Sequence, residues 1–105
     1  MNVLPYEIVK KEDYSYSTVR RMMYRIVVDV SILPTKDELE EIAFAIYKGV
    51  EEEKWDEFTI FVYLAEMGTD LIAYCVAEFQ NNQLAISMIQ KHSVYGTKWE
   101  KSVFK

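Results

Sequence analysis

The chain has 105 residues, of which 50% are hydrophobic, 14% aromatic and 28% charged. This length and composition fit one globular domain, residues 1–105, and leave no room for a second. No apolar stretch approaches the roughly 18 residues of a membrane span, and the N-terminus lacks the basic start and long apolar run of a signal peptide. We therefore expect a cytoplasmic domain with no membrane partner.

The net charge of -5 is divided among three blocks of different sign. Residues 1–28 carry five basic and three acidic side chains, residues 29–78 carry thirteen acids against three lysines, and residues 79–105 carry four lysines against Glu100. Coating nucleic acid phosphates requires clustered lysine and arginine, so the acidic centre argues against a direct nucleic acid partner.

Two strands are expected first, at residues 6–11 and 19–30, paired through residues 13–17. In the second strand, alternate positions separate into two faces. One face carries Met22, Tyr24, Ile26, Val28 and Val30, and the other carries Arg21, Met23, Arg25, Val27 and Asp29.

A helix is predicted next, because Thr35 and Glu38 have the spacing of a capping box. An apolar stripe follows at spacings of three and four, formed by Leu39, Ile42, Ala43, Ile46 and Val50. Phe44 and Tyr47 widen or flank this stripe, and we expect the helix to end between residues 49 and 55.

The remaining elements read as strands. Residues 58–65 are apolar on both faces, as in a central strand, and residues 71–79 are expected to pair with them as a hairpin after a turn at residues 67–70. Asn81 and Asn82 tolerate the left-handed backbone angles of a tight turn before a fifth strand at residues 84–89. The predicted class is α+β: two layers, a largely antiparallel sheet of about five strands, and one main helix on one face, in the order β-β-α-β-β-β.

Several runs of the chain together resemble a small bacterial domain family of unknown function. They are residues 6–13, residues 20–28, the helix start at residues 35–39, and residues 58–63 with the hairpin through Asp70. The resemblance covers roughly residues 6–80. It implies the same fold and brings no activity or site residue with it.

The inventory of reactive side chains argues against an enzyme. A single cysteine, Cys75, excludes an internal disulfide and a multi-cysteine metal site, and a single histidine, His92, excludes a site that needs two imidazoles. Cys75 alternates with apolar residues in its strand, so we interpret it as a core residue. The sequence patterns of phosphate-binding loops, zinc proteases and nucleophile elbows are absent. We expect no metal, no cofactor and no catalytic residue.

A binding role has three candidate surfaces. The first is the strand face that carries Arg21, Met23 and Arg25, near Arg20 and Lys10 or Lys11, with Phe61 and Tyr63 or their alternates beside it. The guanidinium groups and aromatic rings of such a basic and apolar stripe could bind a protein partner. The alternative is that the arginines pair across strands with acids such as Glu7, Asp70 or Glu78.

The second candidate surface is the acidic side of the helix, with Glu40, Glu41, Glu51 and Glu52. Its structural interpretation is a solvated helix face that serves solubility. Its functional interpretation is an inhibitor or immunity protein, of phage or mobile-element origin, that blocks a basic protein surface such as a nuclease groove.

The third candidate surface is the basic and aromatic tail, residues 90–105, which includes Trp99 and Phe104. So many large apolar groups are rare in a disordered segment. We favour docking of the tail on its own sheet. The alternative is insertion into another chain, led by a strand-paired or domain-swapped homodimer, because an open sheet leaves two edges.

The function predicted from the sequence is thus a non-enzymatic protein-protein interaction domain. The acidic inhibitor of a basic protein is the first alternative, and a small-ligand sensor with a pocket between sheet and helix is the second.

Overall fold

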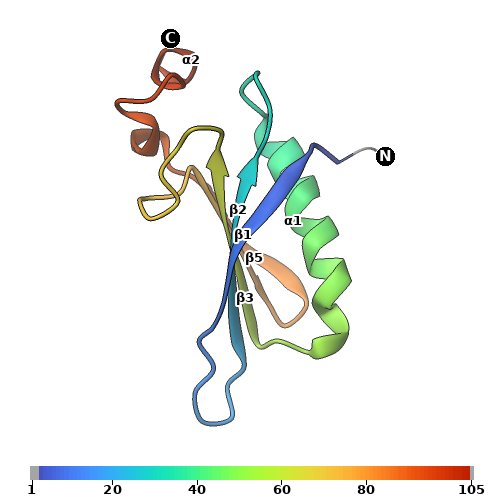
Figure 1. Ribbon diagram of the computed structural model, residues 1–105. Coiled ribbons are helices and arrows are strands. Elements are labelled where there is room, and N and C mark those ends of the chain that lie inside the picture. Colours follow the sequence, from blue (N-terminus) through green and yellow to red (C-terminus); the bar gives the residue numbers. More distant parts are fainter. Residues whose placement is uncertain (1–2, 105) are drawn as a thin grey trace.

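The computed structural model describes residues 3–104, and the chain forms one five-stranded sheet with a helix on one side (Figure 1). The elements are β1 (Tyr6–Asp13), β2 (Arg21–Val28), α1 (Lys36–Val50), the 3-10 helix η1 (Glu51–Glu53), β3 (Glu57–Leu64), β4 (Cys75–Gln80), β5 (Gln83–Ile89), the 3-10 helix η2 (Lys91–Val94) and the short helix α2 (Glu100–Val103). The strands lie in the order β1-β2-β3-β4-β5. The predicted α+β class and the order β-β-α-β-β-β are confirmed.

One pair of strands in the sheet is parallel. β2 and β3 run in the same direction, whereas β1 with β2, β3 with β4, and β4 with β5 are antiparallel. A parallel pair needs a crossover connection, and α1 provides it. The helix begins where the sequence predicts: the Glu38 amide donates to the Thr35 hydroxyl at 3.1 Å, and the Thr35 amide donates to the Glu38 carboxylate at 2.9 Å.

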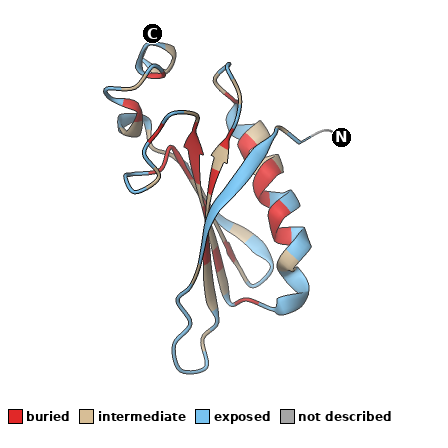
Figure 2. Ribbon diagram, viewed as in Figure 1, coloured by how far each residue is buried: buried red, intermediate tan, exposed pale blue. Residues whose placement is uncertain are grey.

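The core lies between α1 and the sheet, as the buried residues in Figure 2 show. The helix contributes the predicted stripe together with Tyr47, whose ring stacks on Phe79 with 4.2 Å between centroids. The sheet contributes the Tyr24 face of β2 and the alternate residues of its neighbours, which are Phe58, Ile60, Val62 and Leu64 on β3 and Cys75, Ala77 and Phe79 on β4. Among the described residues, no helix is long and apolar enough to cross a membrane.

The fourth strand is shorter than predicted. It begins at Cys75, and residues 65–74 form a loop in which Leu71 is 71% exposed. The chain turns directly after β3, because the Met67 amide donates to the Leu64 carbonyl at 3.2 Å, so residues 71–73 cannot continue the hairpin. The two-residue turn after β4 follows the prediction, with φ of 51° at Asn81 and 64° at Asn82.

The tail contacts its own domain through Val94 and Trp99, beyond the end of the sheet, whereas Phe104 is 43% exposed. Val94 is fully buried and Trp99 is 2% exposed. The indole Nε1 of Trp99 donates to the carbonyl of Ala65, just beyond the end of β3, at 2.8 Å. The tail therefore extends the core past one end of the sheet (Figure 1).

Candidate interaction surfaces

Cys75, the one thiol in the chain, is a core residue, as predicted. It lies on the face of β4 that meets α1 and is 1% exposed. Burial, with the nearby negative charge of Glu40, raises the pKa of the thiol to about 11. A thiol that is protonated and out of reach of solvent is a poor nucleophile.

His92 lies apart from the core, exposed on η2. It borders a hollow of about 590 Å³ whose other walls include Leu71 and Ile72. Within residues 3–104, no three His, Cys, Asp or Glu side chains gather in a way that could hold a metal ion.

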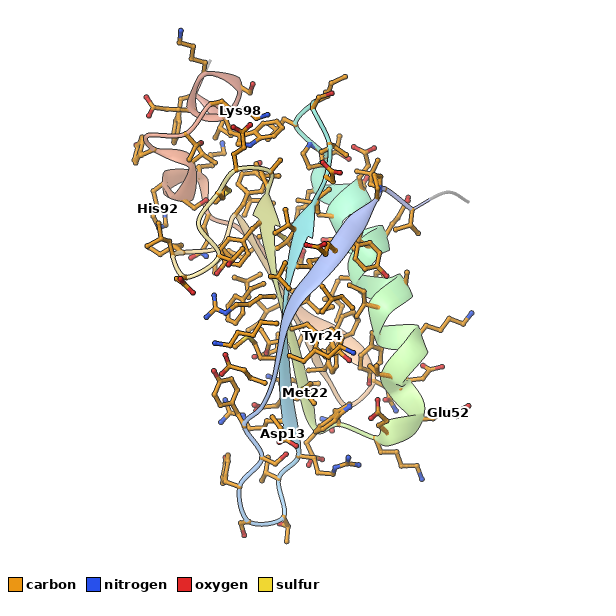
Figure 3. All side chains as sticks on the ribbon, in the orientation of Figure 1. Asp13, Met22, Tyr24, Glu52, His92 and Lys98 are labelled. Carbon is orange, nitrogen blue, oxygen red and sulfur yellow. The ribbon has the colours of Figure 1, made fainter. Side chains whose placement is uncertain are left out.

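The face of the sheet opposite α1, which we call the open face, is the first candidate surface. Two rows of paired residues cross all five strands on it. The first row is Lys10, Arg25, Phe61, Val76 and Met88, and the second is Glu12, Met23, Thr59, Glu78 and Ile86. In Figure 3, α1 lies on the right of the sheet, so the open face is the left side of the sheet, below the tail that carries His92 and Lys98.

The open face is not a basic stripe. Arg21 Nε lies 2.7 Å from the Glu57 carboxylate, and Lys10 Nζ lies 2.6 Å from the Glu12 carboxylate. The hydrogen bond from Lys10 lowers the pKa of Glu12, and the same contact raises the pKa of Lys10. The predicted alternative of cross-strand pairing with acids therefore holds for Arg21, although the acid is Glu57 and not one of the three that the sequence suggested.

Arg25 has a structural task. Its guanidinium donates to the Thr69 carbonyl at 2.9 Å and to the Tyr63 hydroxyl, and it lies 5.2 Å from the centre of the Phe61 ring. The Tyr63 hydroxyl in turn donates to the Leu71 carbonyl at 2.6 Å. The pair ties the loop of residues 65–74 to one end of the open face, and the partner-binding use of Arg25 stays a prediction.

Met23 was expected to be exposed, and it is 4% exposed. It lies in the second row between Glu12 and Thr59, in the floor of a hollow of about 230 Å³ that Tyr14 and Phe61 also line. Long neighbours on a twisted sheet cover a side chain even where no second layer does. Met23 therefore belongs to the interior and is not an interface contact in this conformation.

Exposed apolar groups on the open face gather toward β5. Ile86 is 42% exposed and Met88 is 47% exposed, and both end their rows on this edge strand. The opposite ends of the same rows are the charged residues Glu12 and Lys10. The sequence analysis missed Ile86 and Met88, although the alternation within residues 84–89 and the absence of charge there could have identified them.

The acidic side of the helix is the second candidate surface. Residues 36–56 hold eight acids against three lysines, whereas the rest of the chain holds nine of each sign, so this segment carries the whole net charge. Of the four predicted residues, Glu51 and Glu52 are exposed, Glu41 is half-buried, and Glu40 accepts a hydrogen bond from the Ser87 hydroxyl.

Arg20 lies beside the acidic C-terminal end of the helix. The backbone amide of Arg20 donates to the Asp56 carboxylate at 2.7 Å. The guanidinium of Arg20 donates to the Glu53 carbonyl and lies 4.4 Å from the centre of the Trp55 ring. A hollow of about 450 Å³ opens here between Glu51, Glu52 and Trp55. Among the acids of residues 36–56, Glu51, Glu52 and Glu53 are exposed together at the C-terminal end of α1 and in η1, Asp56 is exposed just beyond them, and Asp37 is exposed at the start of α1.

The tail, the third candidate, does not offer Trp99 to a partner. The indole is buried and bonded to the domain itself, so its predicted role as a partner contact must be corrected. Its exposed aromatic side chains are Tyr95 and Phe104, whose rings stack with 5.0 Å between centroids.

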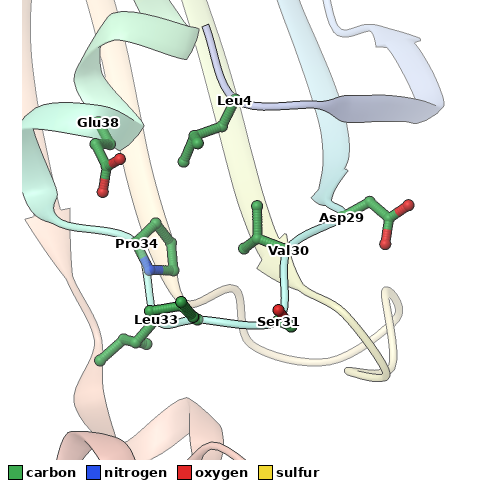
Figure 4. A pocket seen from close by; sticks show the side chains of 8 residues that line it. Leu4, Asp29, Val30, Ser31, Leu33, Pro34 and Glu38 are labelled. Carbon is green, nitrogen blue, oxygen red and sulfur yellow. The ribbon is translucent and has the colours of Figure 1, made fainter.

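One further hollow, of about 440 Å³, lies between the N-terminal segment and the connection from β2 to α1 (Figure 4). Leu4, Val30 and Pro34 line it, and the Asp29 carboxylate points away from them. Its other carboxylate, Glu38, already caps the helix. The hollow is therefore an apolar dent with no convergent polar groups.

Comparison with known proteins finds no protein-family model, no curated protein and no solved structure that matches the chain.

Proposed function

We propose that the chain is a non-enzymatic protein-binding domain that takes its partner on the β4 and β5 side of the open face. The observation that carries the proposal is the gradient along the two rows: paired charges at the β1 end and exposed Ile86 and Met88 at the β5 end. Protein interfaces have an apolar centre and a polar rim, and they are depleted of charge at the centre.

The open face suits this role because its charges have partners within the domain. Glu78 accepts from Thr59 at 3.1 Å and from Gln80 at 2.6 Å, and Arg21 is paired with Glu57. A partner that covers Arg21 and Glu57 buries a pair of opposite charges, and one that covers Glu78 buries a carboxylate that already accepts two hydrogen bonds. Both cost less than the burial of a charge with no partner. The binding free energy then comes from the apolar end, where desolvation is favourable.

The test is site-specific photo-crosslinking in the native host. A photoreactive phenylalanine analogue replaces Met88 on the open face in one variant and Lys48 on the exposed side of α1 in the matched control. We expect a discrete adduct with another protein from position 88 and none from position 48. No adduct from position 88, in a variant that keeps the wild-type circular dichroism spectrum, overturns the proposal.

An acidic inhibitor of a basic protein is the second candidate, favoured by the confinement of the whole net charge to residues 36–56. Charge complementarity of this kind acts mainly on the association rate and weakens with salt. In that case the adduct comes from position 48, and the complex is lost at moderate salt and in the variant Glu51→Lys with Glu52→Lys. Binding that survives both changes rules the inhibitor out.

A further inference from the structure

The two edges of the sheet differ in how they are protected. Native sheets keep their edge strands from pairing with other chains by placing charges, prolines or bulges on them. On β1, five of the eight residues are charged, and the register shifts between Ile8 and Lys10, as at a bulge. The β1 edge is therefore protected against pairing with a strand of another chain.

The β5 edge has little of this protection. Its seven residues, Gln83–Ile89, include no charged residue, no proline and no glycine. A register shift lies near its start, opposite Glu78 and Phe79, and the pairing is regular from Ile86 to Ile89. The strand therefore ends in a regular, uncharged stretch that includes the strand-favouring residues Ile86 and Ile89, and such a stretch is a template for strand addition.

The backbone of this stretch has groups that face outward. The Gln90 amide donates to the Tyr74 carbonyl at 2.7 Å, so the backbone N–H of Gln90 points toward β4. In an antiparallel ladder, inward and outward backbone groups alternate along an edge strand, so the N–H and C=O groups of Ser87 and Ile89 face the free edge. The tail that follows docks beyond the end of the sheet, at Ala65, and within residues 3–104 β5 packs mainly against β4, on the side away from this edge.

We propose that β5 pairs with β5 of a second copy of the chain, antiparallel across a two-fold axis. A strand with no charge meets no like-charge repulsion from its own copy, whereas β1 would set charged side chains against each other. The exposed Ile86 and Met88 of each copy gain apolar neighbours across the axis, and the closed two-fold arrangement is the commonest in homo-oligomers. The pairing joins two open faces into one ten-stranded surface, so it goes beyond the function proposed above.

The size of the contact sets the expected affinity. Seven residues at about 3.3 Å each give an edge about 23 Å long. Edge-to-edge contact over this length, with its flanking side chains, buries on the order of 1,000 Å² in total, which is the lower limit for specific interfaces. The dimer is therefore expected to dissociate in the micromolar range and to depend on concentration.

The test is sedimentation velocity of the full chain over a concentration series from about 10 µM to about 1 mM. The wild type is expected to shift from monomer to dimer. Met88→Lys is expected to raise the dissociation constant at least about tenfold, because it sets two ammonium groups close to the axis. The matched control, Val9→Lys on β1, also adds a lysine at an exposed apolar position of an edge strand and is expected to dimerise as the wild type does.

Amide hydrogen exchange gives a second measurement that does not depend on a variant. The amides of Ser87 and Ile89 are expected to exchange more slowly at high than at low concentration, while amides on β1 do not change. A wild type that is monomeric at about 1 mM overturns the proposal, as does a dimer that Val9→Lys breaks and Met88→Lys does not. These outcomes are independent of the crosslinking test of the proposed function. In that test, an adduct with another protein and an adduct with a second copy of the chain differ in mass.

Discussion

Replacing Trp99 by alanine tests whether the tail is part of the folded domain. The indole is 2% exposed, and complete burial of a side chain of about 250 Å² corresponds to about 6 kcal/mol as an upper value. Measured losses for Trp→Ala in protein cores are about 3–5 kcal/mol. Because the tail can also detach, which removes the cavity, the loss is limited to the free energy of docking, and we expect about 3 kcal/mol.

A smaller change separates the hydrogen bond from the packing. Trp99→Phe keeps an aromatic ring but removes the donor to the Ala65 carbonyl, which lies 2.8 Å from Nε1. The expected loss is about 1 kcal/mol. As a control, Lys101→Ala changes an exposed residue of the same segment and is expected to alter stability by less than about 0.5 kcal/mol.

Two assays read these variants. Urea unfolding followed by circular dichroism gives the free energy of unfolding, and amide exchange over residues 91–103 reports release of the tail. Trp99→Ala is expected to lower the first and to speed the second. A Trp99→Ala variant with unchanged stability and unchanged exchange in the tail refutes the docking described above.

Two further substitutions test the core. Burial raises the pKa of the Cys75 thiol from 9.0 to about 11, so as the pH rises the unfolded chain releases this proton first, and stability falls between about pH 9 and 11. Relative to Cys75→Ala, the wild type should lose about 2–3 kcal/mol over that range in urea unfolding, and parallel pH profiles would contradict this. Trp55 Nε1 is buried without a hydrogen-bond partner, so Trp55→Phe removes an unsatisfied donor and should leave the urea midpoint unchanged or raise it. A fall as large as that of Trp99→Phe would contradict this expectation.

The helix and the faces of β2 could be predicted because their signals are local. The Thr35 and Glu38 pair defines a helix start within four residues, and the alternation in residues 19–30 assigns each side chain to a face without knowledge of the partner strands. Asn81 and Asn82 likewise identify a turn by the backbone angles that they tolerate. In these places local preference and the final fold agree.

The candidate site was harder to predict, since it depends on contacts between distant residues. The pairing of Arg21 with Glu57 requires the parallel register of β2 and β3, and the capture of Arg25 by Thr69 requires the path of a loop 44 residues later. Face assignment correctly placed Met23 away from the helix, but it could not say what covers that position. A side chain's face follows from its own strand, whereas its exposure follows from the neighbouring strands.

The parallel pairing of β2 and β3 has a consequence for folding. β1 and β2 are joined by residues 14–20, and β3, β4 and β5 by residues 65–74 and 81–82, so each half of the sheet is built from contacts close in sequence. The two halves meet along eight residue pairs, from Arg21 with Glu57 to Val28 with Leu64, separated by residues 29–56. Closing that long loop is the entropically demanding step of assembly, and it is rewarded by the ladder between β2 and β3 and by the core that residues of both halves share with α1. The crossover through α1 thus joins a two-stranded hairpin and a three-stranded meander into one sheet with a shared core.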